Sequence, residues 1–194
     1  MAIFSLNPLR QLKRRGINVF HTVAYYLSVK KGLSEYPMES VQRVIFVCYG
    51  NICRSAFAEA YAKKMNAQYQ TNVQFESSGL FAKNGKKSPE DAVRAANALG
   101  IDLSHHRAKL LDPVSITGGD LLVGMDYSHF SLMRRRIPGK KGIFLLKQFA
   151  PQPILNINIE DPYGKSYSRF LECFEEINML VECILKRLGK KNSV

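Results

Sequence analysis

From residue 43 onward, short apolar runs alternate with longer amphipathic stretches. The apolar runs are rich in β-branched residues and predict buried strands at 43–48, 73–77, 120–125 and 142–146. The stretches that follow them carry apolar residues three and four positions apart, which predicts helices at 54–67, 89–99, 127–136 and 165–188. Because strands and helices alternate, we expect a doubly wound, three-layer α/β sandwich around a central four-stranded parallel sheet.

Two of the predicted helices have recognisable features. For the helix at 89–99, Ser88 can cap the N-terminus, Pro89 suits the first turn, and Gly100 can end the helix. The final helix carries large apolar side chains on one face, which we expect to be buried: Phe170, Phe174, Ile177, Val181, Ile184 and Leu188.

Residues 1–40 differ from the rest of the chain. They hold six basic and two acidic residues, and their apolar residues recur at a loosely helical spacing. We expect a basic, helical N-terminal extension at 1–40, followed by the main domain at 41–194. The extension can be one or two amphipathic helices that lie on the domain, or an arm for peripheral contact with a membrane or a partner.

The net charge of +12 favours anionic partners: nucleic acid, an acidic membrane surface, or a phosphorylated substrate. No segment interleaves aromatic and basic residues as a single-strand nucleic-acid platform does, so we expect no nucleic-acid partner. The basic runs 134–136 and 140–141 indicate a solvated basic face, with docking of an acidic phosphoprotein as the alternative. Four cysteines are too few for a disulfide scaffold of this length, which favours a reducing, cytoplasmic location. No apolar run approaches the roughly 18 to 20 residues that span a bilayer.

The turn after the first predicted strand carries a cysteine and an arginine six positions apart. Cys48 ends the strand and Arg54 opens the next helix, while Gly50 and Asn51 tolerate the left-handed backbone that curls a loop. Ligands of doubly wound folds bind where strands end and helices begin. We therefore expect the backbone N–H groups of residues 49–54 to converge on one point as an anion site.

This loop has the chemistry of a site that attacks phosphorus. The guanidinium of Arg54 can grip two phosphate oxygens, and the same positive field favours the thiolate form of Cys48. Ser55 can donate a hydrogen bond to the sulfur. A thiolate beneath a cradled phosphate is a nucleophile aimed at phosphorus. The alternative is a buried, inert cysteine with an exposed arginine nearby.

Displacement by a thiolate also needs an acid for the leaving oxygen and then a base for water. Asp161 is the candidate, because it opens Asp161-Pro162-Tyr163-Gly164 just before the last predicted helix, where a loop can reach the carboxyl edge of the sheet. Such a tetrapeptide can also be an ordinary turn. Tyr163 and Tyr49 can form apolar walls around an aromatic ring of the substrate.

These residues resemble the low-molecular-weight protein tyrosine phosphatases. The resemblance begins with Val-Cys-Tyr-Gly-Asn-Ile-Cys-Arg-Ser at residues 47–55, followed by Ala58-Glu59. Four later segments also match the family pattern: Ser77-Ser78-Gly79, residues 100–108, Met125-Asp126 and the Asp161 tetrapeptide. The resemblance covers about residues 43–188 in order and implies the fold of that family.

The resemblance implies hydrolysis of phosphotyrosine in proteins, with inorganic phosphate as a product. It makes Cys48 the nucleophile, Arg54 the phosphate-binding residue and Asp161 the general acid and base, acting through a cysteinyl-phosphate without a metal or other cofactor. It also assigns substrate contacts to Tyr49, Gly50, Asn51, Ile52, Cys53, Ser55 and Tyr163, and support of the loop to Ser77 and His106. Cys53 matches a second loop cysteine that can trap oxidised Cys48 as a reversible disulfide.

The sequence departs from the family pattern at several positions. Ala56 stands where many members have proline, and the chain has no tryptophan, which many eukaryotic members place beside the pocket. The segment 79–82 and Gly85-Lys86 instead resemble bacterial members associated with capsule and exopolysaccharide production. Those members act on autophosphorylated tyrosine kinases, so the resemblance implies such a kinase as a partner.

Other functions remain open on the same fold. Protein-arginine phosphatases have threonine at the position of Ile52, and the added apolar bulk of isoleucine favours phosphotyrosine. Arsenate reductases need further redox cysteines, whereas we expect Cys173 and Cys183 to pack in the core. A module that only binds a phosphoprotein or a membrane would not need Asp161.

Overall fold

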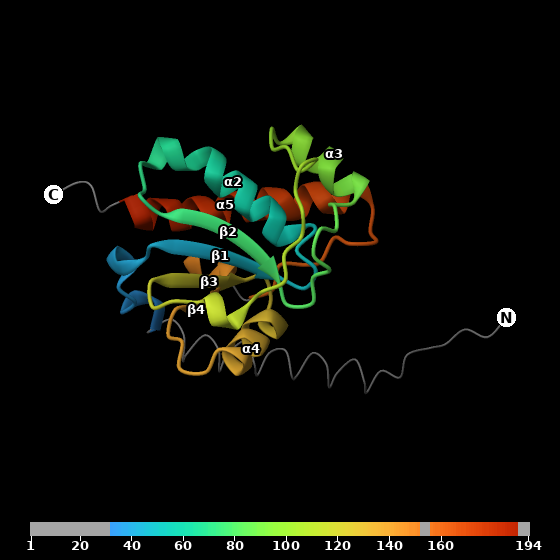
Figure 1. The fold of residues 1–194 in the computed structure, drawn as a ribbon. Helices are drawn as coiled ribbons and strands as arrows, with labels where there is room; N and C mark the ends of the chain where they lie inside the picture. Colours follow the sequence, from blue (N-terminus) through green and yellow to red (C-terminus); the bar gives the residue numbers. More distant parts are fainter. Residues whose placement is uncertain (1–31, 152–155, 190–194) are drawn as a thin grey trace, which may run out of the picture. The chain divides into compact units, whose positions relative to one another are not determined.

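Four parallel strands form one sheet in the order β2-β1-β3-β4, as the computed structural model of the chain shows (Figure 1). The strands are β1 (Arg43–Cys48), β2 (Gln74–Gly79), β3 (Asp120–Gly124) and β4 (Ile143–Leu145). The structure describes residues 32–151 and 156–189, so the helices predicted for the N-terminal extension lie mostly outside the described residues. The predicted parallel sheet is confirmed.

The burial of each strand follows its sequence. In β1 all residues except Arg43 are buried, and in β3 every residue is buried, because both strands lie in the middle of the sheet with layers on both faces. The edge strand β2 alternates buried and more exposed residues instead. The two central strands are therefore buried along almost their whole length, and of the two edge strands β4 is fully buried as well.

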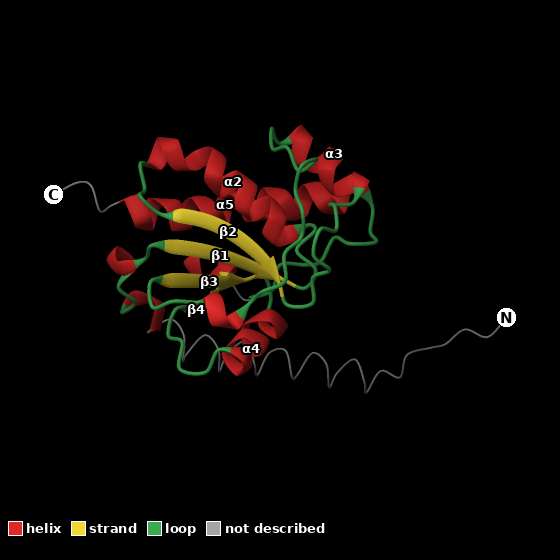
Figure 2. Cartoon of the chain, viewed as in Figure 1, coloured by secondary structure: helices red, strands yellow, loops and turns green. Residues whose placement is uncertain are grey.

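Helices cover both faces of the sheet (Figure 2). The helices α2 (Arg54–Tyr69) and α5 (Tyr167–Gly189) pack against each other on one face, and α4 (Tyr127–Arg136) packs against β3 and β4 on the other. The short helix α3 (Glu90–Ala98) packs against α5. Single-turn 3₁₀ helices occur at η1 (Met38–Ser40), η2 (Pro113–Ser115) and η3 (Leu146–Phe149). The three-layer sandwich is confirmed, and no helix of the described residues is long and apolar enough to cross a membrane.

Aromatic rings fill the contact between α2 and α5. Phe57 of α2 stacks on Phe174 of α5 with ring centroids 4.0 Å apart, and Phe170 meets Phe174 edge-on at 6.1 Å. All six apolar residues that we expected on one face of the final helix are buried. This contact anchors the helix that begins at the phosphate-binding loop to the helix that follows the Asp161 loop.

Two predicted details are wrong. The strand expected at 73–77 spans Gln74–Gly79, because its backbone stays paired with β1 as far as Cys48. Ser88 does not cap α3: the helix begins at Glu90, and Pro89 occupies the N-cap position without a side-chain hydrogen bond. Ser88, the residue before Pro89, has a buried hydroxyl group with no hydrogen-bond partner among the described residues. The other end agrees with expectation, since Gly100 has a φ of 71°.

An ion pair fixes the amino-terminal edge of the sheet. Asp120 is 2% exposed and accepts hydrogen bonds from Nε of Arg43 at 2.9 Å, from Nη2 of Arg43 at 2.7 Å and from the backbone N–H of Thr117 at 2.6 Å. Burial alone would raise the pKa of Asp120, but Arg43 and Thr117 hold that pKa below its usual value.

We expect Asp120→Asn to lower the free energy of unfolding at pH 7 by about 3 kcal/mol, because it leaves Arg43 without its buried partner. Since the folded-state pKa of Asp120 is depressed, this contribution is present above about pH 4 and is lost as the pH falls further. Urea denaturation at pH 7 and pH 3 checks both points. The exposed Asp102 provides the control, and Asp102→Asn should change the midpoint much less. A pH-independent difference between wild type and Asp120→Asn would contradict the assignment.

Strand order also determines where a site can form. The connection after β1 leads to α2 on one face, and the connection after β3 leads to α4 on the other. The loops therefore separate at the carboxyl ends of β1 and β3, the place where doubly wound sheets bind ligands.

Candidate active site

Cys48 is the last residue of β1, and its sulfur faces the loop that follows. The side chain is buried, at 3% exposure. The backbone N–H of Asn51 donates to Sγ at 3.2 Å, and Oγ of Ser55 lies 3.0 Å from the same sulfur. The expected contact between Ser55 and the sulfur is therefore present. These groups, together with the open N-terminus of α2, stabilise negative charge on Cys48.

Asn51 holds the loop in its curled shape. It adopts a φ of 53° and is fully buried. Its Nδ2 donates to Oγ of Ser55 at 2.9 Å and to Oγ of Ser77 at 2.7 Å. Its Oδ1 accepts from the N–H of Lys109 at 2.8 Å, and its carbonyl oxygen accepts from Nε2 of His106 at 2.7 Å. The network thus brings together the residues that we expected to support the loop, and it adds Lys109.

Gly79 allows this loop to lie directly against β2. A Cβ at Gly79 would lie 2.8 Å from the carbonyl oxygen of Tyr49, 2.9 Å from the backbone nitrogen of Asn51 and 2.8 Å from Cβ of Ala82. Two of these neighbours are backbone atoms of the loop itself. Any side chain at this position would displace the loop.

Arg54 joins the cysteine loop to two distant segments. Its side chain is buried, and Nη2 donates to Asp161 at 2.7 Å. Nη1 donates to Asp126 at 3.2 Å and to the carbonyl oxygen of Ile159 at 3.1 Å. Nε is buried and has no partner among the described residues. Arg54 therefore joins Asp161, 107 residues farther along the chain, to the loop that begins at Cys48.

Asp126 is a site residue that the sequence analysis did not assign. It lies between β3 and α4, where its Oδ1 caps the helix by accepting from the N–H of His129 at 3.0 Å and from Oγ of Ser128. Burial alone would raise the pKa of Asp126, but its contacts with His129 and Ser128 hold that pKa below its usual value. Burial lowers the pKa of His129 to about 4, so its imidazole is neutral at pH 7. The position of Asp126 directly after a buried strand is the signal that could have identified it.

Two tyrosines border the site. Tyr49 and Tyr163 are both more than half exposed. The backbone N–H of Tyr163 donates to Oδ1 of Asp161 at 3.2 Å, so the tetrapeptide forms a turn that also fixes the carboxylate. Phe81, which we had not assigned to the site, contacts the ring of Tyr49 with centroids 4.8 Å apart.

The remaining loop residues have mainly packing positions. Ile52 is buried, and its Cγ1 would lie 3.7 Å from a Cβ on Gly50. Cys53 is buried at the N-cap of α2, and burial raises the pKa of its thiol, so this thiol is protonated at neutral pH. All four cysteines are free. Cys173 is buried as expected, but the prediction that Cys183 packs in the core is wrong, because it is partly exposed.

This geometry agrees with the comparisons with known proteins. A family model described as low molecular weight phosphotyrosine protein phosphatase matches residues 43–194. The chain belongs to this family. Within the described residues, no cluster of three or more His, Cys, Asp or Glu side chains could hold a metal ion.

Several known phosphatases resemble the chain over most of their length. EpsP of Ralstonia nicotianae, a probable low molecular weight protein-tyrosine-phosphatase, is 32% identical over 149 residues, which cover 76% of this chain and 97% of EpsP. A protein-arginine-phosphatase of Bacillus subtilis is 31% identical over 149 residues, with the same coverage of 76% and 97%. The structure of a low molecular weight protein tyrosine phosphatase from T. tengcongensis matches with a TM-score of 0.69 and 32% identity, covering 76% of this chain and 99% of that chain.

Proposed function

We propose that the chain hydrolyses phosphotyrosine in proteins, with Cys48 as the nucleophile, Arg54 as the phosphate-binding residue and Asp161 as the general acid and base. The observation that carries the proposal is that Arg54, which follows the loop beginning at Cys48, forms an ion pair with Asp161, while its neighbour Ser55 contacts the sulfur of Cys48. The N–H of Asn51 and the hydroxyl of Ser55 stabilise the thiolate that the reaction needs. The buried, unpartnered Nε of Arg54 is a further donor suited to a phosphate oxygen.

The reaction proceeds in two displacements at phosphorus. The thiolate of Cys48 attacks phosphorus, the P–O bond to tyrosine breaks, and the leaving oxygen takes a proton from Asp161. Water then attacks the cysteinyl-phosphate while the carboxylate of Asp161 accepts a proton from it. The S–P bond breaks, and inorganic phosphate and the thiolate of Cys48 are released.

The ion pair between Arg54 and Asp161 suits this cycle. In the structure Arg54 contacts the Asp161 carboxylate at 2.7 Å. A bound phosphate dianion competes for the same guanidinium and brings negative charge beside Asp161. Displacement from Arg54 leaves the carboxyl group of Asp161 free to act on the leaving oxygen.

Phosphotyrosine is favoured over phosphoarginine by the surfaces near the loop. Both kinds of phosphatase occur among the relatives at nearly equal identity, so identity does not choose between them. Ile52 adds apolar bulk where the arginine phosphatases have a hydroxyl. Tyr49 and Tyr163 are exposed beside the loop and can pack against a substrate ring.

We expect phosphotyrosine peptides to be hydrolysed at least about 100-fold faster, in kcat/KM, than phosphoarginine peptides of matched sequence, because the missing hydroxyl and the apolar surface both disfavour a guanidinium. Release of inorganic phosphate measured side by side provides the test. Ile52→Thr should reduce this preference, and Ile52→Val serves as the control without a hydroxyl. A wild-type preference for phosphoarginine would reject the phosphotyrosine assignment.

The geometry at Gly79 gives a second test. We expect Gly79→Ala to lower kcat/KM for p-nitrophenyl phosphate by about 100-fold, because displacement of the loop by a fraction of an ångström misplaces the nucleophile. At Gly118 nothing lies within 4 Å of an added Cβ, so Gly118→Ala is the matched control. Wild-type turnover by a correctly folded Gly79→Ala variant would show that the loop tolerates the side chain.

The biological setting is also part of the proposal. The substrate we propose is an autophosphorylated bacterial tyrosine kinase, on the basis of the segment 79–86 that resembles the capsule-associated members. A reducing cytoplasm suits a reaction that needs Cys48 as a free thiolate. Residues 1–40 are proposed as an appendage to the domain at 41–194, for peripheral contact with a membrane or a partner.

A further inference from the structure

The last arginine of α4 lies at the edge of the proposed site. Its Nη1 donates to the carbonyl oxygen of Leu80 at 2.6 Å, and its guanidinium lies 4.7 Å from the centre of the Phe81 ring. Phe81 in turn contacts Tyr49, the residue after Cys48. Arg136 is therefore fixed two side chains from the nucleophile.

This position differs from the solvated basic face that the sequence suggested. Arg134 and Arg135 are exposed, as expected, whereas Arg136 is half-buried. The interaction with Phe81 and Leu80 explains the difference, because it turns one arginine of three toward the carboxyl edge of the sheet.

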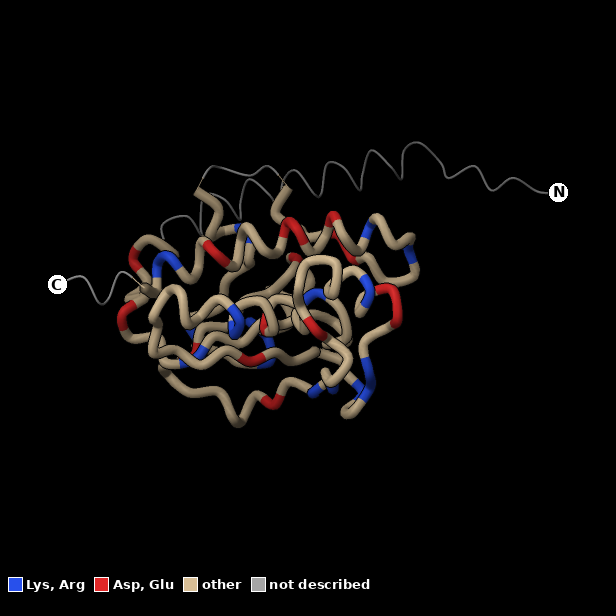
Figure 3. The backbone as a smooth tube through the Cα atoms, turned by 90° about the horizontal axis from the view of Figure 1, so that it is seen from above, with Lys and Arg blue, Asp and Glu red and all other residues tan. Residues whose placement is uncertain are grey.

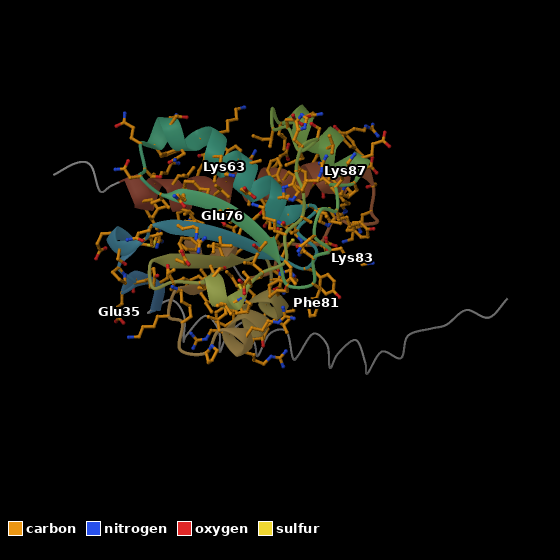
Figure 4. The ribbon with its side chains drawn as sticks, viewed as in Figure 1. Glu35, Lys63, Glu76, Phe81, Lys83 and Lys87 are labelled. Atoms are coloured by element: carbon orange, nitrogen blue, oxygen red, sulfur yellow. The ribbon has the colours of Figure 1, made fainter. Side chains whose placement is uncertain are left out.

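A second set of cations lies along the same edge. The N–H of Gly85 donates to the carbonyl oxygen of Ala108 at 2.9 Å, and the N–H of Ala108 donates to the carbonyl oxygen of Lys86 at 2.9 Å. This pairing holds two basic segments together, and Nζ of Lys86 lies 5.7 Å from the ring centre of Tyr163. Figure 4 shows Phe81, Lys83 and Lys87 on the side of the domain to which the strand arrows point. We call the following residues the basic rim: Lys83, Lys86, Lys87, Arg107, Lys109 and Arg136.

The basic rim is not neutralised within the part of the chain that the structure describes. None of its six residues forms an ion pair with a described carboxylate, whereas several cations elsewhere do. Figure 3 marks the positions of the basic and acidic residues along the backbone. The paired cations outside the site are Arg43, Lys63, Arg94, Lys147, Lys165, Arg169 and Lys186. Some other described cations are likewise without an ion pair among the described residues: Lys64, Arg134, Arg135, Lys140, Lys141 and Arg187. The basic rim is distinguished by its position, because Arg136 reaches Tyr49 through Phe81 and Lys86 lies over the ring of Tyr163.

We propose that the basic rim binds carboxylate side chains next to the phosphotyrosine, with Arg136 as the main specificity-determining residue, so that the preferred substrates are phosphotyrosines in acidic segments. This inference rests on the proposed function. A guanidinium matches a carboxylate with its planar pair of donors, and Arg136 is already held in place, so little ordering is needed on binding. The Phe81 ring beneath it offers an apolar surface for the methylene groups of a glutamate.

The test compares two phosphotyrosine peptides of equal length, one with glutamate and one with glutamine on both sides of the phosphotyrosine. At low ionic strength we expect wild-type kcat/KM to be about tenfold higher for the glutamate peptide, and we expect added salt to reduce this ratio. Arg136→Gln should lower the ratio by about three- to fivefold, the size expected for one partly exposed ion pair. Arg136→Lys should retain part of it. Arg135→Gln removes the same charge one residue away and should leave the ratio unchanged.

Several outcomes would overturn the inference. Equal wild-type rates on the two peptides, or a ratio that Arg135→Gln lowers as much as Arg136→Gln does, would leave Arg136 without the proposed role. Absence of peptide preference together with binding to phosphatidylserine vesicles would assign the rim to a membrane surface. Failure to hydrolyse either peptide would instead reject the proposed function. If Arg136→Gln does not fold, the inference is tested by Arg136→Lys and by the salt dependence of the wild-type ratio of kcat/KM for the two peptides. A ratio that does not change with salt contradicts an ionic subsite.

Discussion

Replacement of Cys48 by serine should abolish turnover of p-nitrophenyl phosphate in the presence of EDTA, with kcat lowered by about 10⁵-fold or more. The serine hydroxyl is not ionised at neutral pH, and the loop provides donors that stabilise a charged sulfur but no base that would activate a hydroxyl. Because serine nearly matches cysteine in volume, the melting temperature should change by only a few degrees. Phosphate release under reducing conditions, combined with thermal denaturation, measures both effects.

The control for this substitution lies in α5. Cys183 is partly exposed, and its Sγ donates to the carbonyl oxygen of Met179 at 3.3 Å. Cys183→Ser should therefore retain wild-type turnover. An active Cys48→Ser variant, or a wild-type protein that is inactive with reduced thiols, would refute the nucleophile assignment.

Replacement of Asp161 by asparagine should have the second-largest effect, and its size should depend on the leaving group. An amide cannot give a proton to the leaving oxygen, and general acid catalysis contributes about 10²- to 10⁴-fold. p-Nitrophenolate leaves readily without protonation, whereas the phenolate of tyrosine does not. We therefore expect kcat to fall much further for a phosphotyrosine peptide than for p-nitrophenyl phosphate.

The control for this substitution is the neighbouring carboxylate, Glu160, which is exposed and paired with Lys165. Glu160→Gln should keep the wild-type rate on both substrates. An equal loss for both substrates would indicate that Asp161 positions Arg54 and does not protonate the leaving group.

The sequence predicts the architecture well for a physical reason. Central strands of a parallel sheet are buried on both faces, so β1 and β3 are continuous apolar runs that are easy to recognise. The cysteine loop is equally easy to recognise in the sequence, because Cys48 and Arg54 belong to one strand-turn-helix unit. Asp161 is a weaker prediction, because it rests on its place before the last helix and on the family counterpart of its tetrapeptide.

What the sequence does not predict depends on contacts between distant segments. Asp126 contacts Arg54 across 72 residues, and Arg136 binds the carbonyl oxygen of Leu80 across 56 residues. Neither contact produces a periodic pattern in the sequence around its two residues. The start of α3 differs from the prediction by one residue. Ser88 and Pro89 both favour a helix start, and the sequence does not show which of them takes the N-cap position.

The network around Asn51 has a consequence for how the protein acquires its activity. Its side chain bonds to Ser77, and to Lys109 at a separation of 58 residues, and Arg54 bonds to Asp161 across 107 residues. Contacts of such large sequence separation form late, because the chain loses the entropy of closing a long loop before these contacts contribute any stability. Chains that have formed only local helices and turns would therefore still lack a competent loop. During refolding, recovered turnover would report the completed native state, and nascent chains would remain inactive until the loop that carries Asp161 has been synthesised.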